Sequence, residues 1–370
     1  MSTTIGVGFA GAGPVTQAIH LPTIARLGGR FRPAHVMDAD GGIASSVAEP
    51  SGARWSTSYD ELLADPDTEV VVIASPDRFH AEQVERACAA GKRAVLCEKP
   101  LALSHAEADR IGEAAAATGV PVLVGAMHTY DPAWMRLDTD HPGFHPHTVR
   151  SDIVLTPNAR SEEFASEVLA RPAEHEIDPD DVRQVADHVR GIVMGLAVHD
   201  LPLVRALCPD DARPEVLRAE TPPSGGYRIV ARAGGVRVLL DAVKTGRARP
   251  RWDLEAWSED ASVRLAFPPP YVHAGSGVLE VRQGDVTRTV GPTARNGYEE
   301  EWRLIAGVLD GRIDPPPLSI ALDDVRFAIE IADGAAEAAA AEVARRGVGA
   351  PVGIPPVAPN GVPLGARSWS

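Results

Sequence analysis

A short apolar run near the start of the chain, Ile5–Ala10, leads directly into Gly11-Ala12-Gly13-Pro14-Val15-Thr16. The first glycine permits a tight strand-to-helix turn, and the second lets backbone N–H groups approach a phosphate at the helix N-terminus. Pro14 suits a first helical turn because its φ is fixed. Thr16 replaces the usual third glycine, and we expect its hydroxyl to donate to a phosphate. The pattern predicts a parallel α/β sheet with a dinucleotide site at its first turn.

The first 127 residues alternate between two hydrophobic periodicities. β-Branched apolar runs predict strands, and Ala-rich segments with helical spacing predict the helices between them. The further expected strands are Ala34–Met37, Val70–Ala74, Ala94–Cys97 and Val120–Gly125, with helices at His80–Ala90 and His105–Ala117. This βαβ order is typical of a mainly parallel sheet, so we expect an α/β Rossmann domain over residues 1–127.

Residues 128–346 follow a different pattern that predicts a second, α+β domain. Several short alternating runs between residues 215 and 291, separated by glycines, indicate a large open sheet that is mainly antiparallel. A further strand is expected at Thr148–Leu155, and helices at Asp187–Leu207, Gly297–Leu309 and Ala321–Arg345, the first of them with Pro202 inside it. Residues 347–370 are expected to form a tail, because they are too rich in proline and glycine to pack regularly.

Charge and cysteine content narrow the classes of partner. The 370 residues include 36 basic and 51 acidic side chains, and the net charge of −15 repels nucleic acid and anionic lipid alike. Three widely spaced cysteines form no disulfide framework and no metal motif, which suits a reducing compartment. No apolar run reaches the ~20 residues of a membrane span, and the start of the chain lacks the basic region of a signal peptide. We therefore expect a cytoplasmic protein with no nucleic-acid or membrane partner.

Asp38 directly follows the second expected strand and lies 25 residues after Gly13. An acid at this distance from the glycine loop typically accepts hydrogen bonds from the adenosine ribose. No Lys or Arg lies between Ala34 and Glu49 to neutralise a 2′-phosphate. The sequence therefore favours NAD(H) as cofactor and leaves NADP(H) as the alternative.

Three further motifs carry a family resemblance. They are His20-Leu21-Pro22, then Ser75-Pro76-Asp77 with His80, and a run from Ala89-Ala90-Gly91-Lys92 to Glu98-Lys99-Pro100. Together with the glycine loop they resemble the glucose–fructose oxidoreductase, inositol dehydrogenase and rhizopine catabolism (Gfo/Idh/MocA) family of nicotinamide-dependent oxidoreductases. The resemblance is close over the first 130 residues, loose from 131 to 190, and returns at Gly191–Leu207 and in the C-terminal helices.

The resemblance implies hydride transfer between the nicotinamide and a secondary alcohol or ketone of a sugar, cyclitol or related small molecule. The active site would lie between the two domains, and the open sheet would carry the oligomer interface. One face of that sheet should be apolar, so a homodimer or homotetramer is expected. Lys99 is implied to be catalytic, because an ammonium beside a hydroxyl stabilises developing alkoxide. The residues expected to contact the cofactor are Gly11, Gly13, Pro14, Val15, Thr16, Asp38, Ser75, Pro76, His80, Glu98 and Lys99.

A second family motif places an Asp and, four residues later, a His on a helix that faces the substrate. Residues 191–202 align with it and put His199 at the histidine position, but Gly195 stands where the Asp should be. Because a spacing of four puts both positions on one helix face, the change removes a carboxylate from the site. His199 remains a candidate general base, since imidazole titrates near neutral pH. The expected substrate pocket comprises Tyr130, Trp134, Gly195, His199 and Asp200. The alternatives are hinge packing for Tyr130 and Trp134 and a helix cap for Asp200.

Other interpretations stay open. Gly195 also fits a dinucleotide-binding sensor or regulator without turnover, or a biosynthetic reductase of an imine or conjugated C=C bond that needs no carboxylate. Alternatively, Lys99 is a surface lysine and His199 a satisfied core histidine. His141, His145 and His147 have a spacing that metal ligands use, but they lie in a proline-containing loop without cysteine. Hydride transfer needs no metal, so no metal site is expected.

Overall fold

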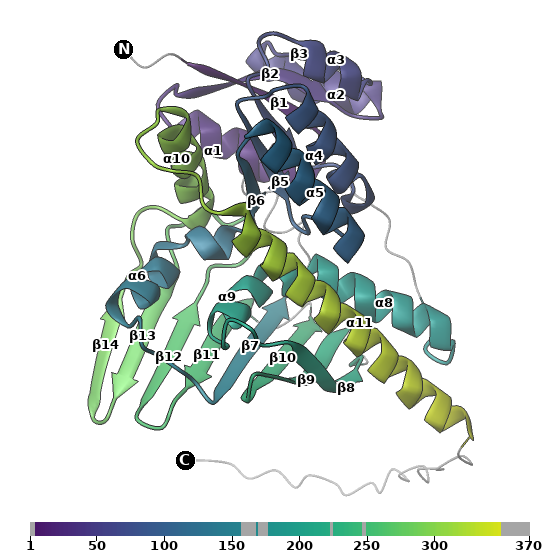
Figure 1. Ribbon diagram of the computed structural model, residues 1–370, viewed down its shortest axis with the longest axis vertical. Helices are drawn as coiled ribbons and strands as arrows, with labels where there is room; N and C mark the ends of the chain where they lie inside the picture. The colour runs from purple at the N-terminus through teal and green to yellow at the C-terminus, as the bar shows by residue number, and fades with distance from the viewer. Residues whose placement is uncertain (1–3, 157–167, 169–176, 223–224, 246–248, 349–370) are drawn as a thin grey trace, which may run out of the picture.

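The computed structural model describes residues 4–156, 168, 177–222, 225–245 and 249–348. Two sheets organise this part of the chain, one in each domain, and the long helix α11 (Leu318–Val348) runs from the first domain across the second (Figure 1). Most of the predicted 347–370 tail lies outside the described residues. Among the described helices, none has both the length and the apolar composition needed to cross a membrane.

The first sheet is entirely parallel, in the order β3-β2-β1-β4-β5-β6, which confirms the predicted Rossmann domain. Its strands are β1 (Ile5–Ala10), β2 (Phe31–Met37), β3 (Arg54–Ser56), β4 (Val70–Ile73), β5 (Ala94–Glu98) and β6 (Val122–Gly125). Its helices are α1 (Leu21–Arg26), α2 (Gly41–Ala48), α3 (Tyr59–Ala64), α4 (His80–Ala89) and α5 (His105–Thr118). The sequence did not predict β3, α2 or α3, because each is too short to show a period.

The second sheet has the order β14-β13-β12-β11-β7-β10-β9-β8 and is antiparallel except between β7 and β10. Its strands are β7 (Thr148–Leu155), β8 (Pro214–Glu220), β9 (Gly226–Ala233), β10 (Val236–Lys244), β11 (Arg251–Trp257), β12 (Ala261–Ala266), β13 (Val278–Gln283) and β14 (Val286–Val290). The helices of this half are α6 (Pro132–Asp140), α8 (Val182–Gly195), α9 (Leu201–Ala206), α10 (Gly297–Leu309) and α11. The α+β prediction is confirmed.

The domain assignment of α10 differs from the prediction. The buried side chains of Trp302 and Ile305 pack with Ile5 and Phe31, on the same face of the first sheet as α1 and α2. The chain therefore returns to the Rossmann domain after completing the second sheet. A division at residue 127 does not capture this return, because hydrophobic periodicity reports a helix but not the sheet that it covers.

The single helix predicted over Asp187–Leu207 is wrong. Helix α8 ends at Gly195, a 3-10 turn spans Ala197–His199, and α9 begins at Leu201. Pro202 lies in the first turn of α9. A backbone N–H at this position has no acceptor within the helix, so proline, which lacks the N–H, is tolerated there. The proline thus starts a helix, and the chain changes direction just before it.

The expectation of an apolar outer sheet face is also wrong. Residues 149 and 153 point into the core, so the alternating residues Arg150 and Asp152 face outward. On this face, ion pairs link Arg150 and Arg251 to Asp152, and Arg264 to Asp253, with N–O distances between 2.6 and 3.1 Å. An apolar outer face was the reason for expecting a homodimer or homotetramer, and this face carries ion pairs instead. The oligomeric state stays a prediction.

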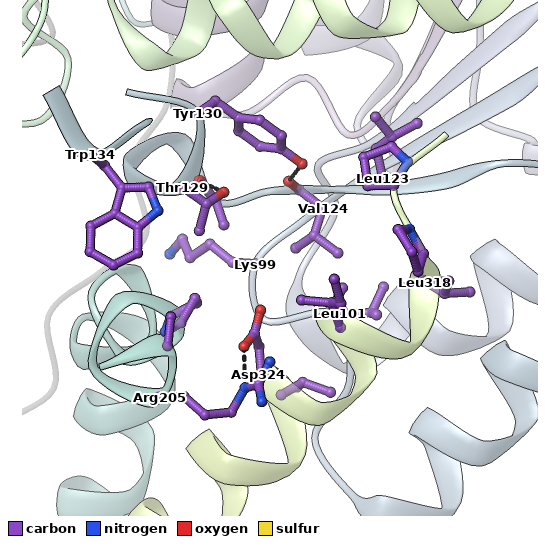
Figure 2. Close-up of a pocket in the computed structure, with 18 of the residues that line it drawn as sticks. Lys99, Leu101, Leu123, Val124, Thr129, Tyr130, Trp134, Arg205, Leu318 and Asp324 are labelled. Carbon is purple, nitrogen blue, oxygen red and sulfur yellow. Dashed lines mark hydrogen bonds and ion pairs between the residues drawn. The ribbon is translucent and has the colours of Figure 1, made fainter. Parts of the chain in front are cut away.

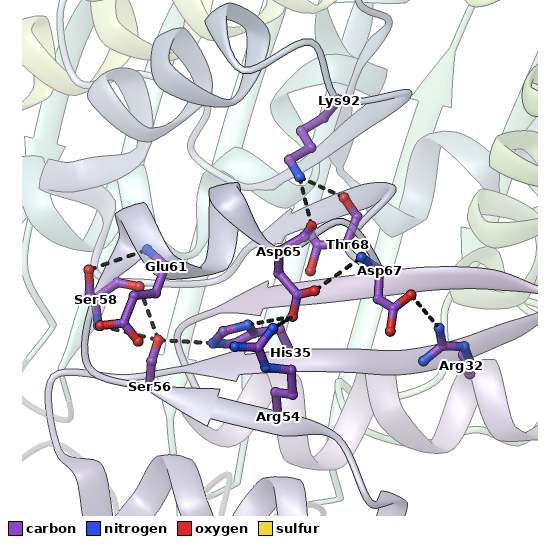
Figure 3. A network of polar contacts seen from close by, with 10 residues as sticks. All are labelled: Arg32, His35, Arg54, Ser56, Ser58, Glu61, Asp65, Asp67, Thr68 and Lys92. Atoms are coloured by element: carbon purple, nitrogen blue, oxygen red, sulfur yellow. Dashed lines mark hydrogen bonds and ion pairs between the residues drawn. The ribbon is translucent and has the colours of Figure 1, made fainter.

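A buried polar network in the Rossmann domain links β2, β3, the segment before β4 and the α4–β5 turn (Figure 3). His35 of β2 lies 2.9 Å from Asp65 Oδ2 and 2.9 Å from Ser56 Oγ. Lys92 donates to the backbone carbonyls of Thr68 and Asp65, at 2.7 and 3.4 Å. The lysine of the Ala-Gly-Lys run thus joins the α4–β5 turn to the segment that precedes β4.

The Asp65 carboxylate is the centre of this network. Burial alone would raise its pKa, but hydrogen bonds from the Asp67 N–H and from His35, and the charge of Arg54, outweigh burial and hold the pKa below its usual value. A depressed folded-state pKa means that the carboxylate stabilises the fold above its unfolded pKa of about 3.9, and that this stabilisation is lost as the pH falls.

We predict that Asp65→Ala lowers the free energy of unfolding by about 3 kcal/mol at pH 7, because it leaves buried His35 without its acceptor. Urea unfolding monitored by circular dichroism measures this. The matched control is Asp67→Ala, which removes only a 3.4 Å ion pair with exposed Arg32 and should cost less than about 1 kcal/mol. The difference in the free energy of unfolding between wild type and Asp65→Ala should become smaller below pH 4. Equal losses in the two variants would contradict the role of Asp65.

Candidate functional site

The glycine loop has the geometry expected of a dinucleotide turn. Gly11 has a φ of +102°, and a Cβ there would lie 2.5 Å from the Ala74 carbonyl oxygen, so only glycine fits. At Gly13 a Cβ would meet no atom within 4 Å, so space is open above the loop. The Ala12 N–H donates to Asp38 Oδ2 at 2.8 Å, which places the carboxylate beside the loop.

Thr16 does not have the position expected of a phosphate donor. Its side chain is fully buried, and its hydroxyl donates to the Gly11 carbonyl at 2.6 Å. The hydroxyl has one proton, and that proton is used in a hydrogen bond within the glycine loop. The remaining donors are the backbone N–H groups of the first helical turn, which have no acceptor within their own helix.

The helix that follows the loop is irregular because of Pro22. A π-helical turn spans Thr16–His20 before α1 begins, and Pro22 has no N–H to give to the Ala18 carbonyl. His273 Nε2, from the β12–β13 connection, lies 2.8 Å from that carbonyl and supplies the missing donor. A residue of the second domain thus completes the first helix of the dinucleotide site.

The loops after β4 and β5 are joined by His80. Its ring nitrogens lie 2.7 Å from the Pro100 carbonyl oxygen and 2.8 Å from that of Ser75, and the side chain is only 2% exposed. The expected cofactor contact of His80 is therefore wrong for its ring nitrogens, and the residue positions the two loops instead. Ser75 donates its hydroxyl proton to Gln83 at 2.6 Å, and Pro76 is exposed beside it.

Glu98, at the end of β5, is anchored by His20. The two side chains approach to 3.1 Å, and the ring of His20 packs edge-on against Trp302. Burial alone would raise the pKa of Glu98, but the hydrogen bond and the positive charges nearby lower it, so the carboxyl is ionised. Glu301 of α10 is also buried near Glu98, and burial together with that charge raises its pKa well above its usual value. Glu301 was not singled out from the sequence, because it reads as one exposed acid in a run of three.

The Lys99 side chain caps the C-terminus of α8. Its Nζ donates to the Gly195 carbonyl at 3.0 Å. The carbonyls at a helix C-terminus carry a partial negative charge equivalent to about half an electron, which favours a cation there. The backbone at Gly195 thus provides an acceptor for Lys99 where the family motif has a carboxylate. Burial lowers the pKa of Lys99, and the charges of Glu98 and Asp77 oppose that effect.

His199 lies in the 3-10 turn rather than on the helix that carries Gly195. Its Nδ1 is 3.2 Å from Met127 Sδ, and its ring meets Trp252 edge-on, with centroids 5.4 Å apart. A thioether only accepts hydrogen bonds, so the neutral ring places its proton on Nδ1 and leaves the lone pair on Nε2. Burial, with Lys99 and His128 nearby, lowers the pKa of His199 well below its usual value, so the ring is neutral at pH 7.

Asp200 does not line the pocket as expected. It is fully buried and accepts hydrogen bonds from Trp252 Nε1 at 2.8 Å and Ser151 Oγ at 2.5 Å, with His128 Nδ1 at 2.9 Å. His128 in turn stacks on Phe267, with ring centroids 3.9 Å apart. This network holds Asp200, the residue next to His199, against the second sheet. His128 and Trp252 could not be assigned from the sequence, because they come from segments far from residue 200.

Tyr130 and Trp134, two residues expected at the substrate pocket, lie on the wall of a cavity (Figure 2). It has a volume of about 550 Å³ and lies beside β6, α6, α9 and the start of α11. Lys99 is the one predicted catalytic residue on its wall, while Val198 and Pro202 on either side of His199 also line it. Among the described residues, no three His, Cys, Asp or Glu side chains meet in an arrangement that would hold a metal.

Comparison with known proteins gives a family match for the first domain. Residues 5–126 match an oxidoreductase family with an NAD-binding Rossmann fold. The family model that matches is that of the Gfo/Idh/MocA oxidoreductases, and residues 5–126 are similar to it. Inositol 2-dehydrogenase 2 of Saccharopolyspora erythraea is 36% identical over 136 residues, which cover 36% of this chain and 40% of that protein. The match thus spans well under half of the relative.

Two solved structures extend the likeness over both domains. The UDP-N-acetylglucosamine 3-dehydrogenase of Acidithiobacillus ferrooxidans has a TM-score of 0.67 at 18% identity, over 91% of this chain and 99% of that one. A 3-ketoreductase of Actinomadura kijaniata, solved with NADP and TDP-benzene, has a TM-score of 0.65 at 16% identity, over 90% and 96% of the two chains. At these identities the likeness establishes the shared fold.

We predict that Gly195→Asp raises the pKa of His199 by about one unit, because it adds a negative charge beside Lys99. The open space at Gly195 accommodates the side chain, since a Cβ there meets no atom within 4 Å. Histidine ring signals followed by NMR through a pH titration measure the shift. Gly195→Asn is the neutral control of the same size and should leave the pKa nearly unchanged. An equal effect of Asp and Asn would show that shape rather than charge is responsible.

Proposed function

We propose that the protein is an NAD(P)-dependent oxidoreductase that interconverts a secondary alcohol and a ketone on a sugar-like or cyclitol-like molecule. The observation that carries the proposal is a Lys99 ammonium close to a neutral His199, at the edge of the sheet where the glycine loop lies. Ligands of open parallel sheets collect at the carboxyl ends of the strands. The similarity to an inositol 2-dehydrogenase supports the substrate class.

The residues present fit a dinucleotide. The open space above Gly13 leaves room for a pyrophosphate, and the backbone of Gly13, Pro14, Val15 and Thr16 forms the helix start beneath it. Asp38 would accept hydrogen bonds from the ribose, while Ser75, Pro76, Glu98 and Lys99 would border the nicotinamide. The bound nicotinamide would supply or accept the hydride at the carbinol carbon.

The chain's own groups handle the oxygen and its proton. In the oxidation direction, His199 Nε2 takes the hydroxyl proton while the carbinol C–H bond breaks and the C=O bond forms. Lys99 holds the oxygen and stabilises its developing negative charge. In reduction the same proton returns from His199. Because the pKa of His199 lies well below 6.5, the imidazole stays available as a base throughout the neutral range.

We predict that the protein binds NADH more tightly than NADPH, because the Asp38 carboxylate repels a 2′-phosphate. Titration followed by nicotinamide fluorescence measures both dissociation constants. Asp38→Asn should narrow the difference and still accept the Ala12 N–H through its amide oxygen. Asp40→Asn, which removes a neighbouring exposed charge at the start of α2, should leave the ratio unchanged. Tenfold tighter binding of NADPH by the wild type, about 1.4 kcal/mol, would overturn the role of Asp38.

We predict that Lys99→Met and His199→Gln each lower kcat by ~10²–10⁴ while changing NADH affinity little. The methionine keeps the length of the lysine stem and removes only its charge. Rates of NAD(H) turnover with inositol and a panel of sugars measure the effect, and thermal unfolding controls for stability. If both variants retain full turnover on a substrate of the wild type, the proton is handled elsewhere. If no polyol, ketone or imine consumes cofactor, the alternative of a binding-only protein takes precedence.

A further inference from the structure

The cavity beside Lys99 is large and its walls are mainly apolar. Its volume of about 550 Å³ is within the range of roughly 300–1,000 Å³ that small-molecule sites occupy. The apolar side chains on its wall include Leu101, Leu123, Trp134, Val198, Leu318 and Ala321. Met135 and Ile320 are 53% and 51% exposed, so apolar surface also faces solvent here.

Most polar side chains of the cavity are already engaged within the protein, and the remaining Asp138 is exposed to solvent. The hydroxyls of Thr129, Tyr130 and Thr139 each donate to a backbone carbonyl, at 2.8, 2.9 and 2.8 Å. Lys99 donates to the carbonyl at the end of α8, and Arg205 pairs with Asp324 at 2.5 Å. A polyol placed wholly in this cavity would exchange water for apolar walls, which is unfavourable for its hydroxyls.

The charges of the cavity also argue against an anionic group. Lys99 and Arg205 are balanced by Asp138 and Asp324, so the lining has no net charge. Asp324 neutralises Arg205 directly. A diphosphate would therefore meet no cluster of cations of the kind that holds such groups.

Lys99 connects this cavity to the proposed reaction site. Figure 2 shows Lys99, Thr129 and Trp134 on one side of the cavity, with Leu101, Leu123 and Leu318 on the other. The lysine stem lines the cavity, while its ammonium reaches the end of α8 close to His199. A molecule held at Lys99 by its reacting oxygen can therefore extend into the apolar space.

We propose that the substrate has two parts, a reacting hydroxyl or carbonyl group held at Lys99 and His199 and an uncharged aryl or bulky alkyl substituent that fills the cavity. This inference rests on the proposed function, and it narrows the substrate from free sugars or cyclitols to derivatives with an apolar substituent. Burial of such a group removes apolar surface from water, and this favours binding.

Two matched pairs of probes test the inference. Phenyl and methyl β-D-glucopyranoside form one pair, and the phenyl and methyl ethers of myo-inositol form the other. Binding to the full chain with NADH present is measured by calorimetry, which requires no turnover. In at least one pair the phenyl compound should bind tenfold or more tightly than the methyl compound. UDP-glucose should bind no better than the methyl glucoside.

A pair of variants assigns the difference to the cavity. Ala321→Phe fills the space from α11 and should remove the preference for phenyl, while Ala341→Phe, on an exposed part of the same helix, should keep it. Equal affinities for phenyl and methyl compounds in both pairs, or no binding of any of them, overturn the inference. A preference for phenyl that survives Ala321→Phe also overturns it.

Turnover separates this inference from the proposed function. If the phenyl preference is seen and depends on Ala321 but no probe or related alcohol exchanges hydride with NAD(H), the cavity assignment stands and the proposed function fails. If free inositol or a sugar is turned over as well as its phenyl derivative, the proposed function stands and the cavity assignment fails.

Discussion

The hydrogen-bonded pair of His20 and Glu98 is the interaction on which the site depends. It joins the helix after the glycine loop to the end of β5, in a place where both groups are shielded from solvent. The carboxylate also lies against β6, since a Cβ at Gly125 would come within 2.8 Å of Glu98 Oε1. Successive side chains at a strand end point to opposite sides, so fixing Glu98 on one side directs Lys99 to the other. Lys99 then meets the end of α8.

The break between α8 and α9 is the second requirement of the site. An uninterrupted helix would use the Gly195 carbonyl for its own hydrogen bond with residue 199. Because α8 stops at Gly195, that carbonyl is available to Lys99, and the 3-10 turn carries His199 toward Met127 and Trp252. The same turn leads into buried Asp200, whose partners on β7 and β11 hold it against the second sheet. The site thus depends on both domains at once.

Several features could be predicted from the sequence because local physics decides them. Gly11 is required by a positive φ and a close backbone approach, and β1, β7 and α10 have the predicted bounds. Tyr130 and Trp134 follow the last Rossmann strand closely and lie on the cavity wall, and their contact with a substrate stays a prediction. The predicted roles of Thr16, His80 and Asp200 failed for one shared reason. Each is buried and bonded to groups whose proximity no spacing along the chain reveals.

The sequence by itself determined the class of fold and the edge of the sheet where a dinucleotide would lie, because strand periodicity and the glycine turn are local properties. It also determined that position 195 has no carboxylate. Only the tertiary structure decided what replaces that carboxylate, a helix C-terminus that accepts from Lys99. It also decided that the outer sheet face is charged and that the cavity at Lys99 is apolar. These outcomes depend on which distant side chains meet, and that is settled by packing of the two domains rather than by any one segment.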